Sequence, residues 1–214
     1  MDSSFHCRLV HPFRLIISGP SNIGKSYLVN KLILNHDLAF ENTPTQIYFF
    51  FKYWQQNYEE LKNKSLIKIV FIKGEPDELF KPIPHALIIF DDLLEENSTQ
   101  IRQWFQAKSH HHMCDIVYVI QNLYSRNSTH RDISLSANYL VIFRNVRDNS
   151  AIAKLNYDIF GAGKAQLLAN VFKETFGQKY RYILFDLDQG TPENFRLRSS
   201  LFPQAGKTLV YVPL

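Results

Sequence analysis

A glycine-rich segment near the beginning of the chain holds the residue types best suited to chemistry. It reads Gly19-Pro20-Ser21-Asn22-Ile23-Gly24-Lys25-Ser26, the pattern G-x-x-x-x-G-K-S. An apolar run, Leu15–Ile17, precedes it, and a stretch with helical character, Tyr27–Leu34, follows it. A strand, a glycine loop and a helix in this order let backbone N–H groups and a helix N-terminus surround a phosphate chain. We therefore expect a nucleoside triphosphate site, with Lys25 at the β- and γ-phosphates and the Ser26 hydroxyl on Mg²⁺.

An acidic pair, Asp91 and Asp92, follows a second apolar run, Ala86–Phe90. The pair emerges where the predicted strand ends, and this is the edge at which parallel α/β sheets hold ligands. We expect Asp91 to accept hydrogen bonds from the water shell of Mg²⁺. Asp92 would then orient and deprotonate the attacking water. Glu95 and Glu96 are alternative bases, because many related ATPases carry the longer Glu at the position of Asp92.

A polar residue, Gln121, ends the next apolar run, Ile116–Ile120. An amide at the tip of the strand beside the magnesium strand can touch both the γ-phosphate and the water, so Gln121 is expected to act as a sensor. This role requires its strand to be inserted between the two motif strands. Such an insertion is typical of ATPases with an additional catalytic acid, and not of small-molecule kinases or GTPases. An arginine finger would stabilise the leaving phosphates, with Arg131 the first candidate and Arg147 the second.

The elements that must position these residues alternate between strands and helices, which favours a mostly parallel α/β sheet. Apolar runs predict strands at Arg14–Ser18, Gln46–Phe51, Lys68–Ile72, Ala86–Asp91, Asp115–Gln121, Tyr139–Arg144 and Tyr182–Leu187. Helical spacing predicts helices at Lys25–His36, Asn97–His111, Ala151–Phe160 and Lys164–Phe176. A last short strand is expected at Thr208–Val212. The predicted fold is a three-layer α/β P-loop NTPase of the additional-strand, catalytic-acid type, with helices flanking the central sheet.

The composition is that of a globular protein. The chain has 214 residues, 45% of them hydrophobic and 21% charged, and this length suffices for one buried core. We expect a single domain over 1–214, with a core of about 14–188 and a C-terminal extension at 189–214. The formal net charge of +4 permits a polyanionic partner without requiring one. Two cysteines are too few for a disulfide framework, and we expect neither a signal peptide nor a membrane-spanning segment.

Taken in order, the motifs resemble the genome-packaging ATPases of the FtsK/HerA superfamily, of poxvirus, virophage and Polinton type. Beyond the glycine loop, the matching segments are Ile88–Glu95, Ser109–His112, Val119–Tyr124, Arg131–Tyr139, Phe143–Asp148, Tyr182–Leu187 and Phe195–Arg198. They cover nearly all of the chain between Leu15 and Phe202. Val146 and Ser136 depart from the family, which tends to have Pro and Asn at these places.

The resemblance implies a homo-oligomeric ring, a pentamer or hexamer, in which each subunit hydrolyses ATP with Mg²⁺ at a subunit boundary. The ring would pump double-stranded DNA, independently of its sequence, into a preformed capsid, docked on a capsid vertex protein. The protein is then expected in the host cell at sites of virus assembly, or in the virion, and not as a secreted protein. Basic residues available for DNA contacts include Lys52, Lys62, Lys64, Lys68, Lys108 and Arg126.

Two other functions stay open. A nucleotide or nucleoside kinase would need an arginine-rich lid and an acceptor pocket, and it has no use for an acid pair beside a sensor strand. A P-loop ring that uses ATP only for assembly or DNA anchoring needs no Asp92 or Gln121.

The histidines of Ser109–Cys114 are a weak zinc motif, because adjacent histidines on a helix point in different directions. The aromatic segment Tyr48–Trp54 is expected to be a core strand that runs into a subunit contact, with base stacking as the alternative.

Overall fold

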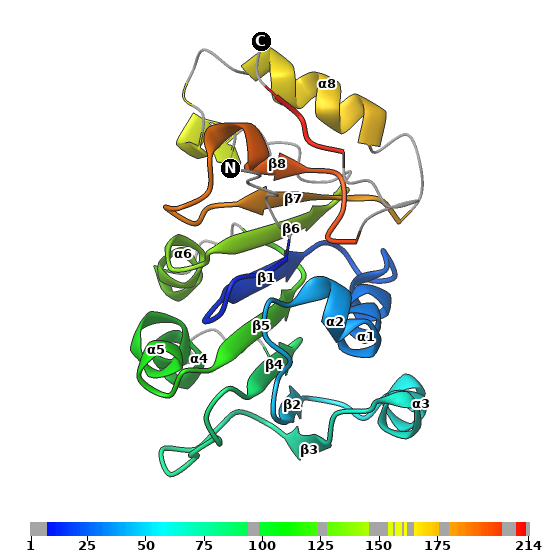
Figure 1. Ribbon diagram of the computed structural model, residues 1–214, viewed down its shortest axis with the longest axis vertical. Coiled ribbons are helices and arrows are strands. Elements are labelled where there is room, and N and C mark those ends of the chain that lie inside the picture. The colour runs from blue at the N-terminus through cyan, green and yellow to red at the C-terminus, as the bar shows by residue number, and fades with distance from the viewer. Residues whose placement is uncertain are drawn as a thin grey trace, which may run out of the picture.

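The computed structural model describes residues 8–93, 99–123, 128–145, 154–155, 157–159, 161, 165–175, 180–202 and 209–212. Eight strands form one sheet in the order β3-β2-β4-β5-β1-β6-β7-β8 (Figure 1). They are β1 (Arg14–Ser18), β2 (Ile47–Phe51), β3 (Ile69–Lys73), β4 (Leu87–Asp91), β5 (Asp115–Ile120), β6 (Tyr139–Phe143), β7 (Tyr182–Asp186) and β8 (Leu197–Arg198). The first six run parallel, while β7 is antiparallel to β6 and to β8. The predicted mostly parallel α/β sheet is confirmed.

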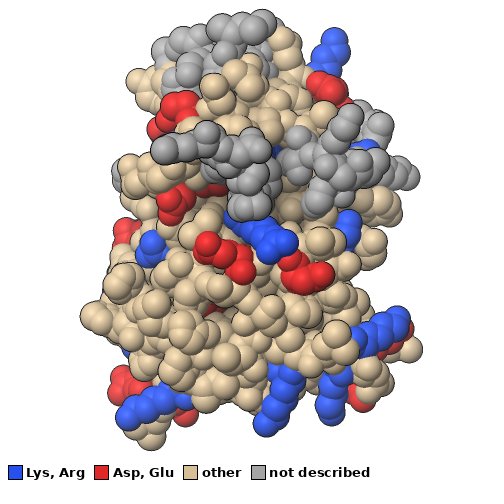
Figure 2. All heavy atoms as spheres, viewed as in Figure 1, with Lys and Arg blue, Asp and Glu red and all other residues tan. Residues whose placement is uncertain are grey.

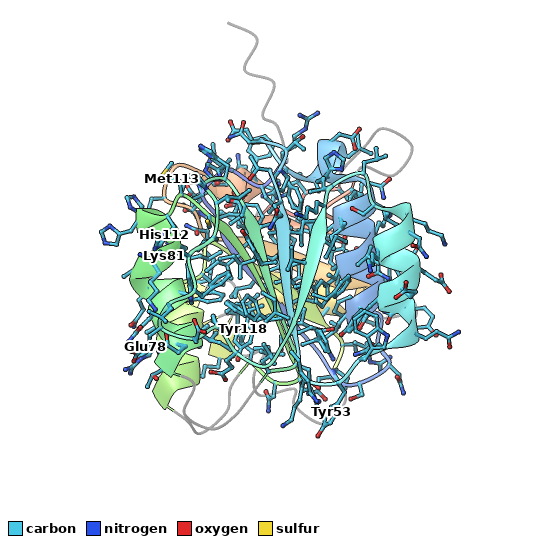
Figure 3. The ribbon with its side chains drawn as sticks, turned by 90° about the horizontal axis from the view of Figure 1, so that it is seen from below. Tyr53, Glu78, Lys81, His112, Met113 and Tyr118 are labelled. Atoms are coloured by element: carbon cyan, nitrogen blue, oxygen red, sulfur yellow. The ribbon has the colours of Figure 1, made fainter. Side chains whose placement is uncertain are left out.

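Helices cover both faces of the sheet, which Figure 3 shows edge-on between its two helical layers. One face packs against α1 (Lys25–Leu34), α2 (His36–Ala39) and α3 (Gln56–Lys64). The other packs against α4 (Thr99–Gln103), the π-helical turn η1 (Trp104–Lys108), α6 (Ser128–Leu135) and α8 (Ala165–Thr175). The short α5 (Ser109–His111) continues η1, and a 3₁₀ turn, η3 (Glu193–Phe195), precedes β8. Within the described residues, no helix combines the length and apolar character needed to cross a membrane.

Alternate residues of each strand enter opposite cores, because side chains alternate between the faces of a sheet. In β1, Leu15 and Ile17 pack in the core beneath α1, while Ile16 packs in the core that contains Trp104. Strands buried on both faces need apolar residues at every position, and this explains the uninterrupted apolar runs in the sequence.

The strand order brings distant segments of the chain to one edge of the sheet. β5 lies between β1 and β4, so Ser18 pairs in register with Ile120, and Asp91 pairs with Val119. The predicted insertion of this strand between the two motif strands is therefore confirmed. Because all three strands are parallel, their C-terminal ends meet at the same edge.

The boundaries differ from the sequence predictions where local patterns are weak. The first helix ends at Leu34 rather than His36, and α3 was not predicted at all, because only Tyr58 and Leu61 on it are buried. α6 and β8 were missed as well. A strand was expected at Thr208–Val212, but the described residues 209–212 make one isolated bridge. The helix predicted at 151–160 falls largely outside the described residues.

A buried carboxylate anchors the opposite, N-terminal edge of the sheet. Asp115, at the start of β5, accepts hydrogen bonds from the Phe13 backbone N–H and from Nδ1 of His11, both at 2.9 Å. His11 Nε2 lies 3.1 Å from Nδ1 of His85, which precedes β4. The hydrogen bond to Asp115 and the charge of that carboxylate raise the pKa of His11, although burial opposes the rise. The histidine thus ties the segment before β1 to β5.

Replacing His11 tests this anchor. His11→Ala should lower the free energy of unfolding by about 1–3 kcal/mol at pH 6, because a buried carboxylate loses its donor. A raised folded-state pKa stabilises the protein below the unfolded pKa of about 6.5, and this stabilisation disappears as the pH rises through the folded pKa. The loss should therefore be smaller at pH 8.5, as measured by urea denaturation at both pH values. An equal loss at both would contradict the ion pair, and the exposed His110→Ala serves as the control.

Candidate active site

The glycine loop lies between β1 and α1 and is pinned to both neighbouring strands. The Gly19 N–H donates to the Ile120 carbonyl at 3.3 Å, and a Cβ at position 19 would lie only 2.7 Å from Cβ of Phe143. Gly24 has a φ of 107° and Asn22 a φ of 61°, so the loop needs left-handed backbone on both sides of Ile23. Glycine at positions 19 and 24 is therefore a steric requirement of this loop.

The Lys25 side chain folds back over its own loop. Its Nζ donates to the carbonyl oxygens of Gly19 at 2.6 Å and Pro20 at 2.9 Å. Burial lowers the pKa of Lys25, and the nearby Asp92 and Asp91 oppose this shift. The ammonium group is thus held by two carbonyls of its own loop, within electrostatic reach of both carboxylates.

Asp91 ends β4 as a buried carboxylate, only 6% exposed. Its Oδ2 accepts a hydrogen bond of 2.6 Å from the hydroxyl of Tyr58 on α3. Burial raises the pKa of Asp91, while this hydrogen bond and the charge of Lys25 act in the opposite direction. Tyr58 was not identified from the sequence, because nothing in its local pattern distinguishes it from the other aromatic residues of this region.

Asp92 and Gln121, predicted from separate strands, touch each other. The Gln121 amide Nε2 lies 3.2 and 3.1 Å from the two carboxylate oxygens of Asp92 and donates to them. Asp92 has a φ of 52°, a backbone rarely adopted by a residue with a side chain, and its N–H donates to the Val119 carbonyl at 3.2 Å. The turn exposes the Asp92 carboxylate while Asp91 stays buried.

The oxygen atoms at this edge suit Mg²⁺ when a phosphate chain completes the set. The described residues contain no cluster of three or more His, Cys, Asp and Glu side chains that would hold a metal ion unaided. The Ser26 hydroxyl and the Asp91 carboxylate are hard oxygen donors, the type that Mg²⁺ prefers. The hydrogen-bond partner of Asp91 is a neutral phenol, which leaves its negative charge to be balanced by a cation. The residues present therefore fit the ion.

A hollow of about 580 Å³ opens on the other side of the loop, toward β6 and β7. Its lining includes Gly24, Tyr27 and Lys31 from the loop and α1, Phe143 from β6, and Tyr180 before β7. Tyr27 and Tyr180 are 73% and 63% exposed. This hollow could not be predicted from the sequence, because residues far apart in the chain form it.

The remaining predicted site residues are placed only in part. Pro20, Ser21 and Ile23 complete the loop. Arg131 falls on α6, and its side chain is not among those described. Arg147 lies outside the described residues, as do the alternative bases Glu95 and Glu96 and the basic residue Arg126.

Comparison with solved structures finds two similar chains among others. One is the genome packaging NTPase B204 from Sulfolobus turreted icosahedral virus 2, in complex with ATP-gammaS, at 13% identity and a TM-score of 0.47 over 95% of this chain and 98% of that one. The other is the flagellar accessory protein FlaH from Methanocaldococcus jannaschii, at 17% identity and a TM-score of 0.46 over 83% and 86% of the two chains. No family model and no curated protein matches the chain.

The tight fit of Gly19 yields a direct test of the loop. Gly19→Ala should abolish nucleotide binding, since the new Cβ would overlap Phe143 and displace the loop from β6. Binding of a fluorescent ATP analogue measures this. Gly190→Ala is the matched control, because Gly190 lies in a turn after β7 where an added Cβ meets only the end of the Asp188 side chain, at 3.3 Å. Retained binding by Gly19→Ala would contradict the loop geometry.

Proposed function

We propose that this chain is an ATP-hydrolysing motor that translocates double-stranded DNA during packaging of a viral genome. The observation that carries the hydrolase assignment is the contact between Gln121 and Asp92, one residue beyond the buried Asp91. An exposed carboxylate held by a neutral amide, next to a buried carboxylate, supplies a base for water beside a residue for Mg²⁺.

In this proposal each site residue has a separate role. The loop amides and Lys25 hold the phosphate chain, after the ammonium leaves the carbonyls of Gly19 and Pro20. Ser26 and Asp91 would hold Mg²⁺, which would supply positive charge to the phosphate chain. Asp92 orients the water and accepts its proton, and Gln121 exchanges its contact with Asp92 for one with the γ-phosphate.

The hollow beside Gly24 is suited to the nucleoside part of ATP. It adjoins the loop on the side of β6, away from Asp91, so a phosphate chain in the loop would place the base there. Its volume of about 580 Å³ falls within the usual range of small-molecule sites. The exposed rings of Tyr27 and Tyr180 offer surfaces on which a purine can stack.

The strand order favours a hydrolase over a kinase. β5 lies next to β4 and brings Gln121 to Asp92, and a kinase would have no use for an amide at this place. The inserted strand instead presents an amide to the residue that would activate water. This is the arrangement expected for ATP-driven motors with an additional catalytic acid.

DNA contact is proposed for the end of the molecule formed by β2, α3 and β3. Residues 52–73 contain five lysines and two glutamates, and all five lysines are exposed. Figure 2 shows Lys and Arg side chains around the lower end of this view, with acidic side chains between them. Such dispersed charge suits contacts with a phosphate backbone without base recognition.

In a ring, an arginine from the neighbouring subunit would complete each site. Arg131 and Arg147 are the candidates for this trans-acting residue.

Substitution of the acid and the amide separates their roles. Asp92→Asn should lower kcat for ATP hydrolysis by about 100-fold or more, because the general base is lost. Gln121→Ala should cause a smaller loss, since it removes the partner that orients Asp92. Both variants should keep the ATP affinity of the wild type, measured by fluorescent-nucleotide binding. Unchanged turnover in Asp92→Asn would remove Asp92 as the base and leave Glu95 or Glu96.

DNA dependence tests the motor assignment. ATP hydrolysis should rise with long double-stranded DNA, and this stimulation should weaken as salt increases. Lys62→Glu, on exposed α3, should raise the DNA concentration required and reduce the salt dependence. Lys81→Glu makes the same charge change in the loop before β4, on the α4–α5 side of the sheet (Figure 3), and should behave as wild type. Hydrolysis indifferent to DNA would contradict translocation.

A further inference from the structure

The contact between Tyr58 and Asp91 is the closest interaction at the acid pair, with 2.6 Å between the hydroxyl and Oδ2. We propose that Tyr58 is a positioning residue for Mg²⁺: it fixes one oxygen of Asp91 and leaves the other for the water shell of the ion. This inference rests on the proposed nucleotide site. It adds a residue of α3 to a site otherwise built from strand ends and the glycine loop.

The ring of Tyr58 is held so firmly that its hydroxyl has one position. The residue is 1% exposed. The Phe49 ring lies 4.9 Å away, Phe71 is stacked at 5.5 Å, and Trp54 meets the ring edge-on at 5.6 Å, measured between centroids. These contacts come from β2, β3 and the β2–α3 connection, so they surround the ring from separate directions. A donor fixed in this way can orient the carboxylate that accepts from it.

The topology brings Tyr58 to Asp91 from the side away from the glycine loop. β4 lies between β2 and β5, and Phe51 at the end of β2 is in register with Asp91. The short connection 52–55 then returns the chain as α3, which places Tyr58 beside this register position. The loop and Gln121 lie beyond Asp91 on the β5 side. Tyr58 therefore supports the carboxylate without occupying the space of the phosphate chain.

The chemistry of the donor matters as much as its position. A lysine or arginine at this place would neutralise Asp91 and compete with a cation. The phenol donates a hydrogen bond and adds no charge, so the carboxylate keeps its attraction for Mg²⁺. Among the described residues, no other donor makes a hydrogen bond to the Asp91 carboxylate. Loss of this hydroxyl would leave the buried oxygen unpartnered and the carboxylate free to rotate.

Tyr58→Phe tests the inference, because it removes the hydroxyl and keeps the ring. Binding of a fluorescent ATP analogue is titrated with Mg²⁺, and a parallel titration of the nucleotide is made in EDTA. The Mg²⁺ concentration for half-maximal enhancement of binding should rise about 10-fold, the effect typical of a lost outer-shell partner. Affinity in EDTA should stay within about twofold of wild type, because the loop contacts are intact. A residue that only packs α3 would affect nucleotide affinity equally with Mg²⁺ and in EDTA.

Tyr118→Phe is the matched control. Tyr118 on β5 is also a buried tyrosine, 1% exposed, and its hydroxyl has no hydrogen-bond partner among the described residues. It lies on the opposite face of the sheet, toward the α4–α5 layer (Figure 3). This variant should keep the wild-type response to Mg²⁺. Tyr58→Met, a second variant without the hydroxyl, should shift the Mg²⁺ response as Tyr58→Phe does and serves if the latter fails to fold.

Three outcomes would overturn the inference. A wild-type protein that binds no nucleotide would refute the proposed function and this inference together. A wild type that binds with Mg²⁺ enhancement, while both Tyr58 variants keep its Mg²⁺ response, would refute the inference alone. Equal losses of affinity with Mg²⁺ and in EDTA would also refute it, since they would show that Tyr58 serves only to pack α3.

Discussion

The site depends on the parallel pairing of β1, β5 and β4. Ser18 lies in register with Ile120, and Val119 with Asp91, so three chain segments end at one level of the sheet. The glycine loop, the Gln121 amide and the acid pair each follow one of these ends. A slip of one residue in any pairing would turn core side chains outward and separate the site residues. The two apolar cores that fix this register therefore also set the geometry of the site.

Neutral hydrogen-bond donors, rather than ion pairs, hold the two carboxylates of the site in place. Asp91 accepts from the Tyr58 hydroxyl and Asp92 from the Gln121 amide, while the ammonium of Lys25 is bound to carbonyls of its own loop. Two carboxylates are thus held in place by neutral donors, and the charge of Lys25 acts on both of them from its own loop. Magnesium and a phosphate chain carry the charges that complete such a set.

Sequence reasoning succeeded where chemistry and pattern coincide. The positions of the loop and of the acid pair follow from apolar runs that end in polar residues, and the order of β1, β5 and β4 follows from the role expected of Gln121. It missed α3, whose buried residues are too few to give a periodic signal, and with it Tyr58. The hollow beside Gly24 was also missed, because α1, β6 and the segment before β7 form it together. Contacts between elements distant in sequence carry no local signature, so the support of the site was less predictable than its reacting groups.

We propose that these strand ends form a water-activating nucleotide site. Its most direct test is phosphate release from ATP and Mg²⁺ by the isolated protein, with Lys25→Ala as the blank. We expect turnover by the wild type without any acceptor, lost on removal of Mg²⁺ and lowered by about 100-fold or more in the variant. Equal rates for both proteins, or ATP consumption only when a nucleoside or nucleotide acceptor is added, would contradict hydrolysis at this site.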